Sequence, residues 1–115
     1  MPHALIALIL VAFLALPAAG HHGWGSYDAK SPVTVAGKIE TSKFENPHVT
    51  LTVKGSDKVW TVTLAPPSRM MTRGALEKIV AVGNTISAYG YPSTRDANEM
   101  RAERITVAGK TYEMR

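Results

Sequence analysis

The property that most constrains how this chain folds is an alternation of apolar and polar residues in short runs bounded by glycine and proline. Val49, Leu51 and Val53 are separated by threonines, and the run 60–64 repeats the pattern. Successive side chains of a strand point to opposite faces, so a period of two places the apolar residues on one face. The pattern predicts an all-β chain built from half-buried strands.

Turn residues divide the chain between these strands. The cluster Gly55-Ser56-Asp57 separates the two runs just described, which predicts that they form a β-hairpin. Gly109-Lys110 is typical of a second tight turn. Gly37 interrupts the first strand, as glycine does at a bulge or a barrel corner. Besides the two strands of the hairpin, the alternation predicts strands at 33–40, 85–91, 100–107 and 111–114.

One short helix is expected in the middle of the chain. The prolines at 66–67 end the third strand, because proline cannot donate to a strand ladder. Ser68 is a candidate N-terminal cap for a helix through 70–72, and Gly74 is a candidate C-terminal cap. Residues 75–79 could form a further helical turn.

The order of elements is three strands, a short helix and two main strands. This is the order of the OB-fold, a five-stranded, partly open Greek-key barrel, and a small antiparallel sandwich is the alternative. Residues 21–115 contain no repeat or linker and are predicted to form a single OB-like β-barrel domain. The predicted interior residues are Val35, Ile39, Leu51, Val62, Ile86 and Ile105.

The first twenty residues read as a targeting segment. Residues 4–16 form an almost unbroken apolar run, ALIALILVAFLAL, followed by small residues. A run of about 13 residues is too short for a membrane-spanning helix and matches the apolar region of a secretory signal peptide, although no Lys or Arg precedes it. We predict that residues 1–20 are a signal peptide. Cleavage after Gly20 would make His21 the first residue of the mature chain, and cleavage after Ala19 is the alternative.

Composition limits the classes of function. An exported chain is expected in the periplasm or outside the cell, with no membrane span after cleavage. The absence of cysteine excludes disulfides, thiolate catalysis and cysteine-ligated zinc. Thirteen basic residues are scattered among nine acidic ones, for a net charge of +4. This dispersed charge lacks the basic stripe of a nucleic-acid footprint, so we expect no nucleic-acid partner.

The histidines are the strongest candidates for chemistry. His21, His22 and His48 would all belong to the mature chain. Imidazole is a good ligand for Cu(II), Ni(II) and Zn(II), and an N-terminal His21 could chelate through both its amine and its ring. A nitrogen from His48 would complete a site that favours copper. Cleavage after Ala19 would instead place His22 third, which suits square-planar Cu(II) or Ni(II).

Other readings of the same residues stay open. His21 and His22 could form a solvated tail, and His48, after Asn46-Pro47, could be a turn residue. Arg69 and Arg73, four residues apart, could hold a carboxylate or phosphate or simply form a solvated basic face. A stacking surface is a further possibility, from the aromatic residues Trp24, Tyr27, Trp60, Tyr89 and Tyr91.

Two functions follow from these candidates. The first is a periplasmic carrier or sensor of copper, without catalytic activity. The second is a non-catalytic OB-type interaction module that binds a small ligand or a partner protein. The fold alone does not choose between them, because the same barrel carries many unrelated ligands.

Several strings resemble a known family. They are HHGW, SYDAKSPVTVAGKI, FENPHVTLTV, VWTVTLAPPSRMMTRG, AYGYPS and NEMRAERITVAG. Together they resemble a family of small exported bacterial proteins known only as a domain of unknown function, over His21 to Tyr112. Phe44 stands where family members usually carry tryptophan. The resemblance implies an exported barrel-like domain and no catalytic residues.

Overall fold

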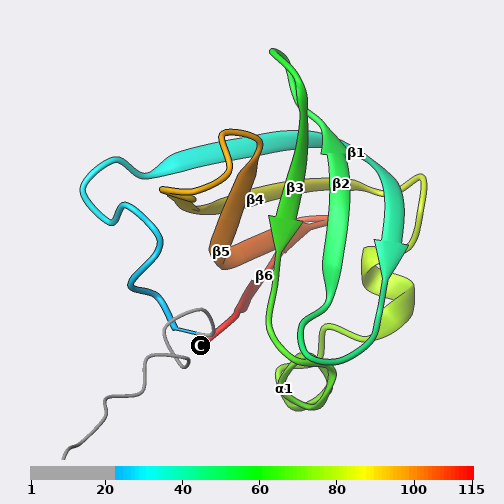
Figure 1. The fold of residues 1–115 in the computed structure, drawn as a ribbon. Helices are drawn as coiled ribbons and strands as arrows, with labels where there is room; N and C mark the ends of the chain where they lie inside the picture. Colours follow the sequence, from blue (N-terminus) through cyan, green and yellow to red (C-terminus); the bar gives the residue numbers. More distant parts are fainter. Residues whose placement is uncertain (1–22) are drawn as a thin grey trace, which may run out of the picture.

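The structure, a computed structural model, describes residues 23–115 (Figure 1). Six strands, one α-helix and one 3-10 turn follow one another along the chain. In order they are β1 (Val33–Lys43), β2 (Thr50–Lys54), β3 (Val59–Thr63), α1 (Pro67–Thr72), the 3-10 turn η2 (Glu77–Val80), β4 (Thr85–Pro92), β5 (Glu99–Val107) and β6 (Lys110–Glu113).

Five of these strands close into a barrel. The sheet order is β3-β2-β1-β4-β5-β6, and a parallel pairing between β3 and β5 joins its two sides. The long strand β1 makes closure possible, because its first half pairs with β4 and its second half with β2. A Cβ on Gly37 would lie 1.9 Å from the Lys54 carbonyl oxygen, so only glycine fits at this crossing. The predicted five-stranded, OB-like barrel is confirmed, and β6 extends it beyond β5.

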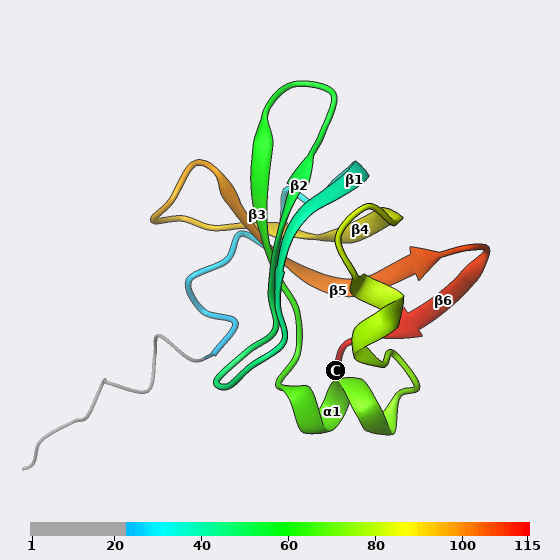
Figure 2. The same ribbon diagram turned by 90° about the vertical axis from the view of Figure 1, so that its right-hand side faces the viewer.

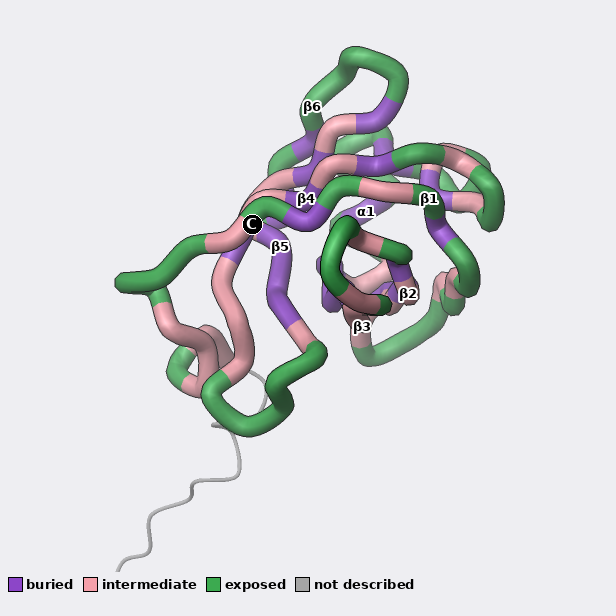
Figure 3. Tube along the Cα trace, turned by 90° about the horizontal axis from the view of Figure 1, so that it is seen from above, coloured by how far each residue is buried: buried purple, intermediate pink, exposed green. Residues whose placement is uncertain are grey.

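The barrel interior is apolar, as the alternation predicts. All six predicted interior residues are buried, at 2 % exposure or less. Figure 3 shows buried positions alternating with intermediate or exposed ones along strands such as β4. The helix α1 lies beneath one end of the barrel (Figure 2), and its fully buried Met70 points into the core. The helix therefore closes the end that the strands leave open.

Two local predictions are wrong in detail. Ser68 does not cap α1, because it lies inside the helix, which begins with Pro67 and has Pro66 at the N-cap position. Proline is favoured in the first helical turn because its missing N–H has no partner there in any case. The turn before β6 lies at Ala108-Gly109, both with positive φ, and not at 109–110. The predicted cap at Gly74 is consistent with its φ of +86°.

The segment between residue 23 and β1 is held against the loop that joins β4 to β5. Tyr27 forms an isolated β-bridge with Ser93. The Asp28 amide donates to the Pro92 carbonyl at 2.9 Å, and the Thr94 amide donates to the Ser26 carbonyl at 2.9 Å. These backbone contacts fasten the beginning of the described chain to the barrel.

Within residues 23–115, no helix combines the length and the apolar character needed to cross a membrane. The predicted signal peptide, 1–20, lies outside the described residues.

Candidate functional site

A buried arginine occupies the seam where β3 and β5 close the barrel. Arg101 pairs with Thr63 in the parallel ladder, and only 7 % of its surface is exposed. Burial is the main cause of its lowered pKa, and the nearby positive charges of Arg115 and Arg69 add to the effect. A buried cation is costly unless polar groups surround it, so the contacts of this side chain define the site.

The guanidinium of Arg101 brings together residues that are distant in sequence. Its Nη1 donates to the Gly23 carbonyl oxygen at 3.1 Å. Its Cζ lies 4.1 Å from the centre of the Trp24 ring and 5.9 Å from that of Tyr27. Its Nη2 lies 3.5 Å from His48 Nε2. We call these five residues, Gly23, Trp24, Tyr27, His48 and Arg101, the Arg101 cluster.

The contact with Arg101 also limits which ring nitrogen of His48 can carry a proton. At 3.5 Å it is at the long limit of a hydrogen bond. A guanidinium can only donate, so a hydrogen bond here requires an unprotonated Nε2 as the acceptor. His48 is half-buried just before β2, where the Val49 amide donates to the Ala65 carbonyl at 2.9 Å. The ring therefore has a lone pair facing the cluster.

The carboxylate of Glu99, which lies on β5 two residues before Arg101, borders the cluster. Glu99 Oε2 accepts hydrogen bonds from the Tyr27 hydroxyl at 2.6 Å and from Thr63 Oγ1 at 2.7 Å. Burial raises the pKa of Tyr27 well above its usual value. The hydrogen bond to Glu99 and the negative charge of Glu99 raise this pKa further. These side chains and His48 line a surface pocket of about 440 Å³. The pocket offers a carboxylate, an imidazole and hydroxyls to a small polar ligand.

Four of the five candidate stacking residues belong to the Arg101 cluster or lie next to it. Trp24 meets Tyr27 and Tyr91 edge-on, at centroid distances of 6.3 and 6.0 Å, and Tyr91 meets Tyr89 in the same way. The Arg115 guanidinium lies 4.1 Å from the Trp24 ring centre. The rings meet edge-on, and Arg101 and Arg115 both lie over Trp24, so these residues do not present a flat stacking platform.

Trp60 lies apart from that group, at the end of the β2–β3 hairpin. It is partly buried against the core, and its ring N–H donates to Asp57 at 3.2 Å. That hydrogen bond is the main cause of the lowered pKa of Asp57.

The predicted metal ligands divide between the described and the undescribed parts of the chain. His48 belongs to the Arg101 cluster, whereas His21 and His22 lie outside the described residues. Among residues 23–115, no group of three or more His, Cys, Asp or Glu side chains is placed to hold a metal ion. Sequence reasoning did not identify Arg101 and Glu99 as site residues. Both lie in NEMRAERITVAG, one of the strings that carry the family resemblance, and that resemblance implies no role for them.

Comparisons with known proteins bear on the family and the fold. The profile of a family of unknown function (DUF6152) matches residues 2–103. No curated protein matches the chain. The structure is similar to one titled "Crystal structure of the ZRD-deleted mutant of TiaS in complex with agmatine", with a TM-score of 0.55, 14 % identity, and coverage of 76 % of this chain and 27 % of that one.

A second similar structure is a complex of TiaS with a tRNA and ATP. Its TM-score is 0.51 at 14 % identity, over 72 % of this chain and 19 % of that one. This chain thus corresponds to about a quarter or less of the length of TiaS. At this identity the likeness concerns the fold alone.

Proposed function

Because this chain belongs to DUF6152, a family of unknown function, we propose its function from its own residues: a small exported β-barrel protein that binds Cu(II) without catalysing a reaction. The ligands are the N-terminal nitrogens created by signal-peptide cleavage, with His21 and His22, and the imidazole of His48. The protein acts in the periplasm, or outside the cell, as a carrier or sensor of copper.

The observation that carries this proposal is the position of Gly23. Its carbonyl oxygen and His48 Nε2 both contact the guanidinium of Arg101. His22 directly precedes Gly23 in the sequence, and each residue extends a chain by at most about 3.6 Å. A mature chain that starts at His21 therefore begins within reach of His48.

The chemistry of these donors favours copper. An N-terminal amine and the Nδ1 of the same histidine close a chelate, and a second imidazole supplies a third nitrogen. Nitrogen donors prefer Cu(II) to Ca²⁺ or Mg²⁺, which bind oxygen. The positive charge of Arg101 opposes a dication, so binding requires the metal to replace Arg101 at the His48 lone pair. An imidazole binds a metal only when neutral, and copper affinity should therefore weaken below about pH 6.5.

Export is tested first, by the intact mass of the protein purified from the periplasm and the medium of its host. We expect a chain that begins at His21 or Gly20. A full-length chain found only in the cytoplasm would contradict export and would remove the N-terminal amine from the site.

Copper binding is tested by titrating this exported protein with Cu(II). His48→Ala should weaken binding by about tenfold or more, and so should an additional methionine before His21, because each removes a ligand. Lys43→Ala, which changes a residue of the same pocket that has no imidazole, is the matched control. Unchanged Cu(II) curves for His48→Ala would rule the site out, and thermal unfolding of the apo proteins would show whether His48 is instead a structural residue.

The pocket beside His48 favours the second candidate function. It is lined in part by Tyr27, Thr63 and Glu99 and would suit a small polar ligand of an interaction module. This function takes precedence if copper does not bind at His48.

A further inference from the structure

The outer face of α1 carries a second surface pocket, whose lining is basic. Arg69 and Arg73 are four residues apart, which places both side chains on one helical face. Ser68 and Thr72 repeat this spacing beside them, and Pro66 completes the lining of a pocket of about 380 Å³. No acidic residue described in the structure contributes to this lining.

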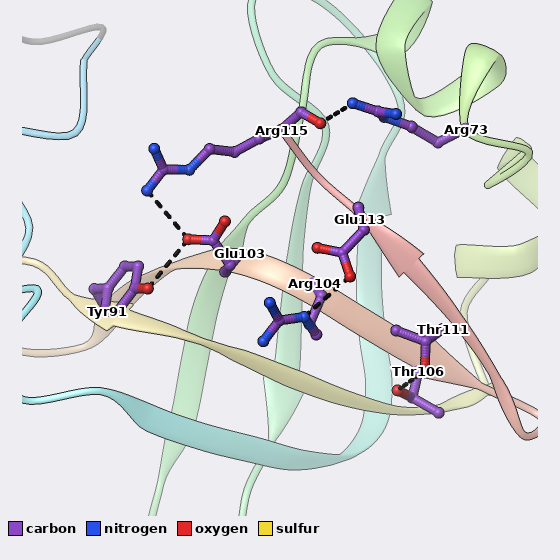
Figure 4. A network of polar contacts seen from close by, with 8 residues as sticks. All are labelled: Arg73, Tyr91, Glu103, Arg104, Thr106, Thr111, Glu113 and Arg115. Atoms are coloured by element: carbon purple, nitrogen blue, oxygen red, sulfur yellow. Dashed lines mark hydrogen bonds and ion pairs between the residues drawn. The ribbon is translucent and has the colours of Figure 1, made fainter.

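One of the two arginines is already oriented by the fold. Arg73 Nη2 donates to the backbone carbonyl oxygen of Arg115, the contact drawn in Figure 4. A guanidinium carries five N–H groups, so this hydrogen bond holds the side chain and leaves the others available. A side chain held in place loses less conformational entropy when a ligand binds.

Positive charge is in excess around this pocket. Within residues 23–115 the ion pairs are Arg104–Glu113 and Arg115–Glu103, and neither includes Arg69 or Arg73. Arg69 also lies close enough to Arg101 to contribute to the lowering of its pKa, after burial and the charge of Arg115. The cations of α1 and β5 thus repel one another, and a bound anion would relieve this repulsion.

We propose that Arg69 and Arg73, together with the Ser68 hydroxyl, form a binding site for a phosphate group, as free phosphate or as the phosphomonoester headgroup of a lipid. A phosphate group carries nearly two negative charges and several acceptor oxygens, enough for two guanidinium forks and a hydroxyl. A carboxylate has one charge and would engage one fork. The Thr72 hydroxyl donates to the Ser68 carbonyl at 3.0 Å, so Ser68 is the hydroxyl donor that remains.

The test is a titration of the metal-free protein with inorganic phosphate, at constant ionic strength, followed by NMR shifts of the α1 backbone amides. In the double variant Arg69→Gln/Arg73→Gln, phosphate should bind about tenfold more weakly or not at all. Arg95→Gln, which removes one charge from an exposed position in the β4–β5 loop, should change the dissociation constant by less than about twofold. Acetate should bind at least about tenfold more weakly than phosphate.

Two further experiments test whether the variants fold and which source supplies the phosphate group. Circular dichroism shows whether the double variant folds, and if it does not, the single variants Arg69→Gln and Ser68→Ala replace it. Vesicles with and without phosphatidic acid distinguish the source: binding that depends on phosphatidic acid and on Arg69 indicates a lipid headgroup, and its absence indicates free phosphate. The proposal is overturned if phosphate does not bind, if acetate binds equally well, or if the α1 variants behave like Arg95→Gln.

Discussion

The barrel interior and the Arg101 side chain are both buried, but different forces stabilise their surroundings. The interior consists of apolar side chains such as Leu51, Val62 and Ile105, each at 1 % exposure or less. The cluster surrounds one cation with a carbonyl oxygen, an imidazole and two aromatic rings. Apolar burial has no preferred direction, whereas each contact of a buried charge depends on the position of its partner.

The two regions also differ in which parts of the chain they need. The interior consists mainly of the inward-facing apolar side chains of the strands and of Met70 from α1, which pack against one another inside the barrel. The cluster additionally needs Gly23, Trp24 and Tyr27, which belong to a segment that precedes the first strand. The cluster therefore depends on a segment outside the barrel strands, whereas the interior does not.

The largest effect is expected inside the barrel. Ile105→Ala should lower the free energy of unfolding by about 2–5 kcal/mol, because it removes apolar contacts and leaves a cavity. Ile105 is fully buried, whereas Val82 is 63 % exposed, so Val82→Ala serves as the control. Urea denaturation measures both variants. Equal midpoints for the two would show that the interior does not depend on close packing.

A smaller effect, dependent on pH, is expected in the cluster. Tyr27→Phe removes a 2.6 Å hydrogen bond to Glu99 and should cost about 1 kcal/mol at neutral pH. The folded-state pKa of Tyr27 is raised by burial and then by Glu99. Its contribution is therefore complete below about pH 10, the unfolded value, and is lost as the pH rises through the higher folded-state value.

The variant should consequently lose less stability than the wild type as the pH rises above about 10, because the unfolded wild-type chain releases a proton that the folded one retains. Urea denaturation at several alkaline pH values measures the two slopes. If the free energy of unfolding changes equally with pH in both proteins, the ionisation of Tyr27 is not coupled to folding. The contrast between a cluster that depends on charge and an apolar interior would then be weaker.

The smallest effect is expected on the outside of β5. Arg104 Nε and Glu113 Oε2 form an ion pair at 3.1 Å, with side-chain exposures of 43 % and 52 % (Figure 4). Exposed pairs are screened by water and salt. Arg104→Gln should leave the urea midpoint at neutral pH unchanged within error. A loss of stability as large as that of Tyr27→Phe would show that surface ion pairs contribute as much as the cluster.

The predictable parts of this fold are those with a local signal. Alternation placed Val35, Val62 and Ile86 inside the barrel, and all three are buried. The hairpin around Gly55 follows from a turn cluster between two alternating runs. The cap of α1 was mispredicted because a proline at the first helical position and a serine beside it are both valid start signals.

The candidate site was only partly predictable. His48 was recognised as a metal-binding residue type, and the structure places it beside Arg101. That neighbour had no local signal, because a charged residue between Met100 and Ala102 has the sequence pattern of an exposed strand position. The copper ligands His21 and His22 remain predictions.

The sequence by itself determined the strands and their inward faces, because a period of two is read along a few consecutive residues. Only the tertiary structure decided that Arg101 is buried and that Gly23 and His48 share its guanidinium, across separations of 78 and 53 residues. The physical reason is that burial of a charge depends on which distant groups surround it, and no pattern within a strand specifies them.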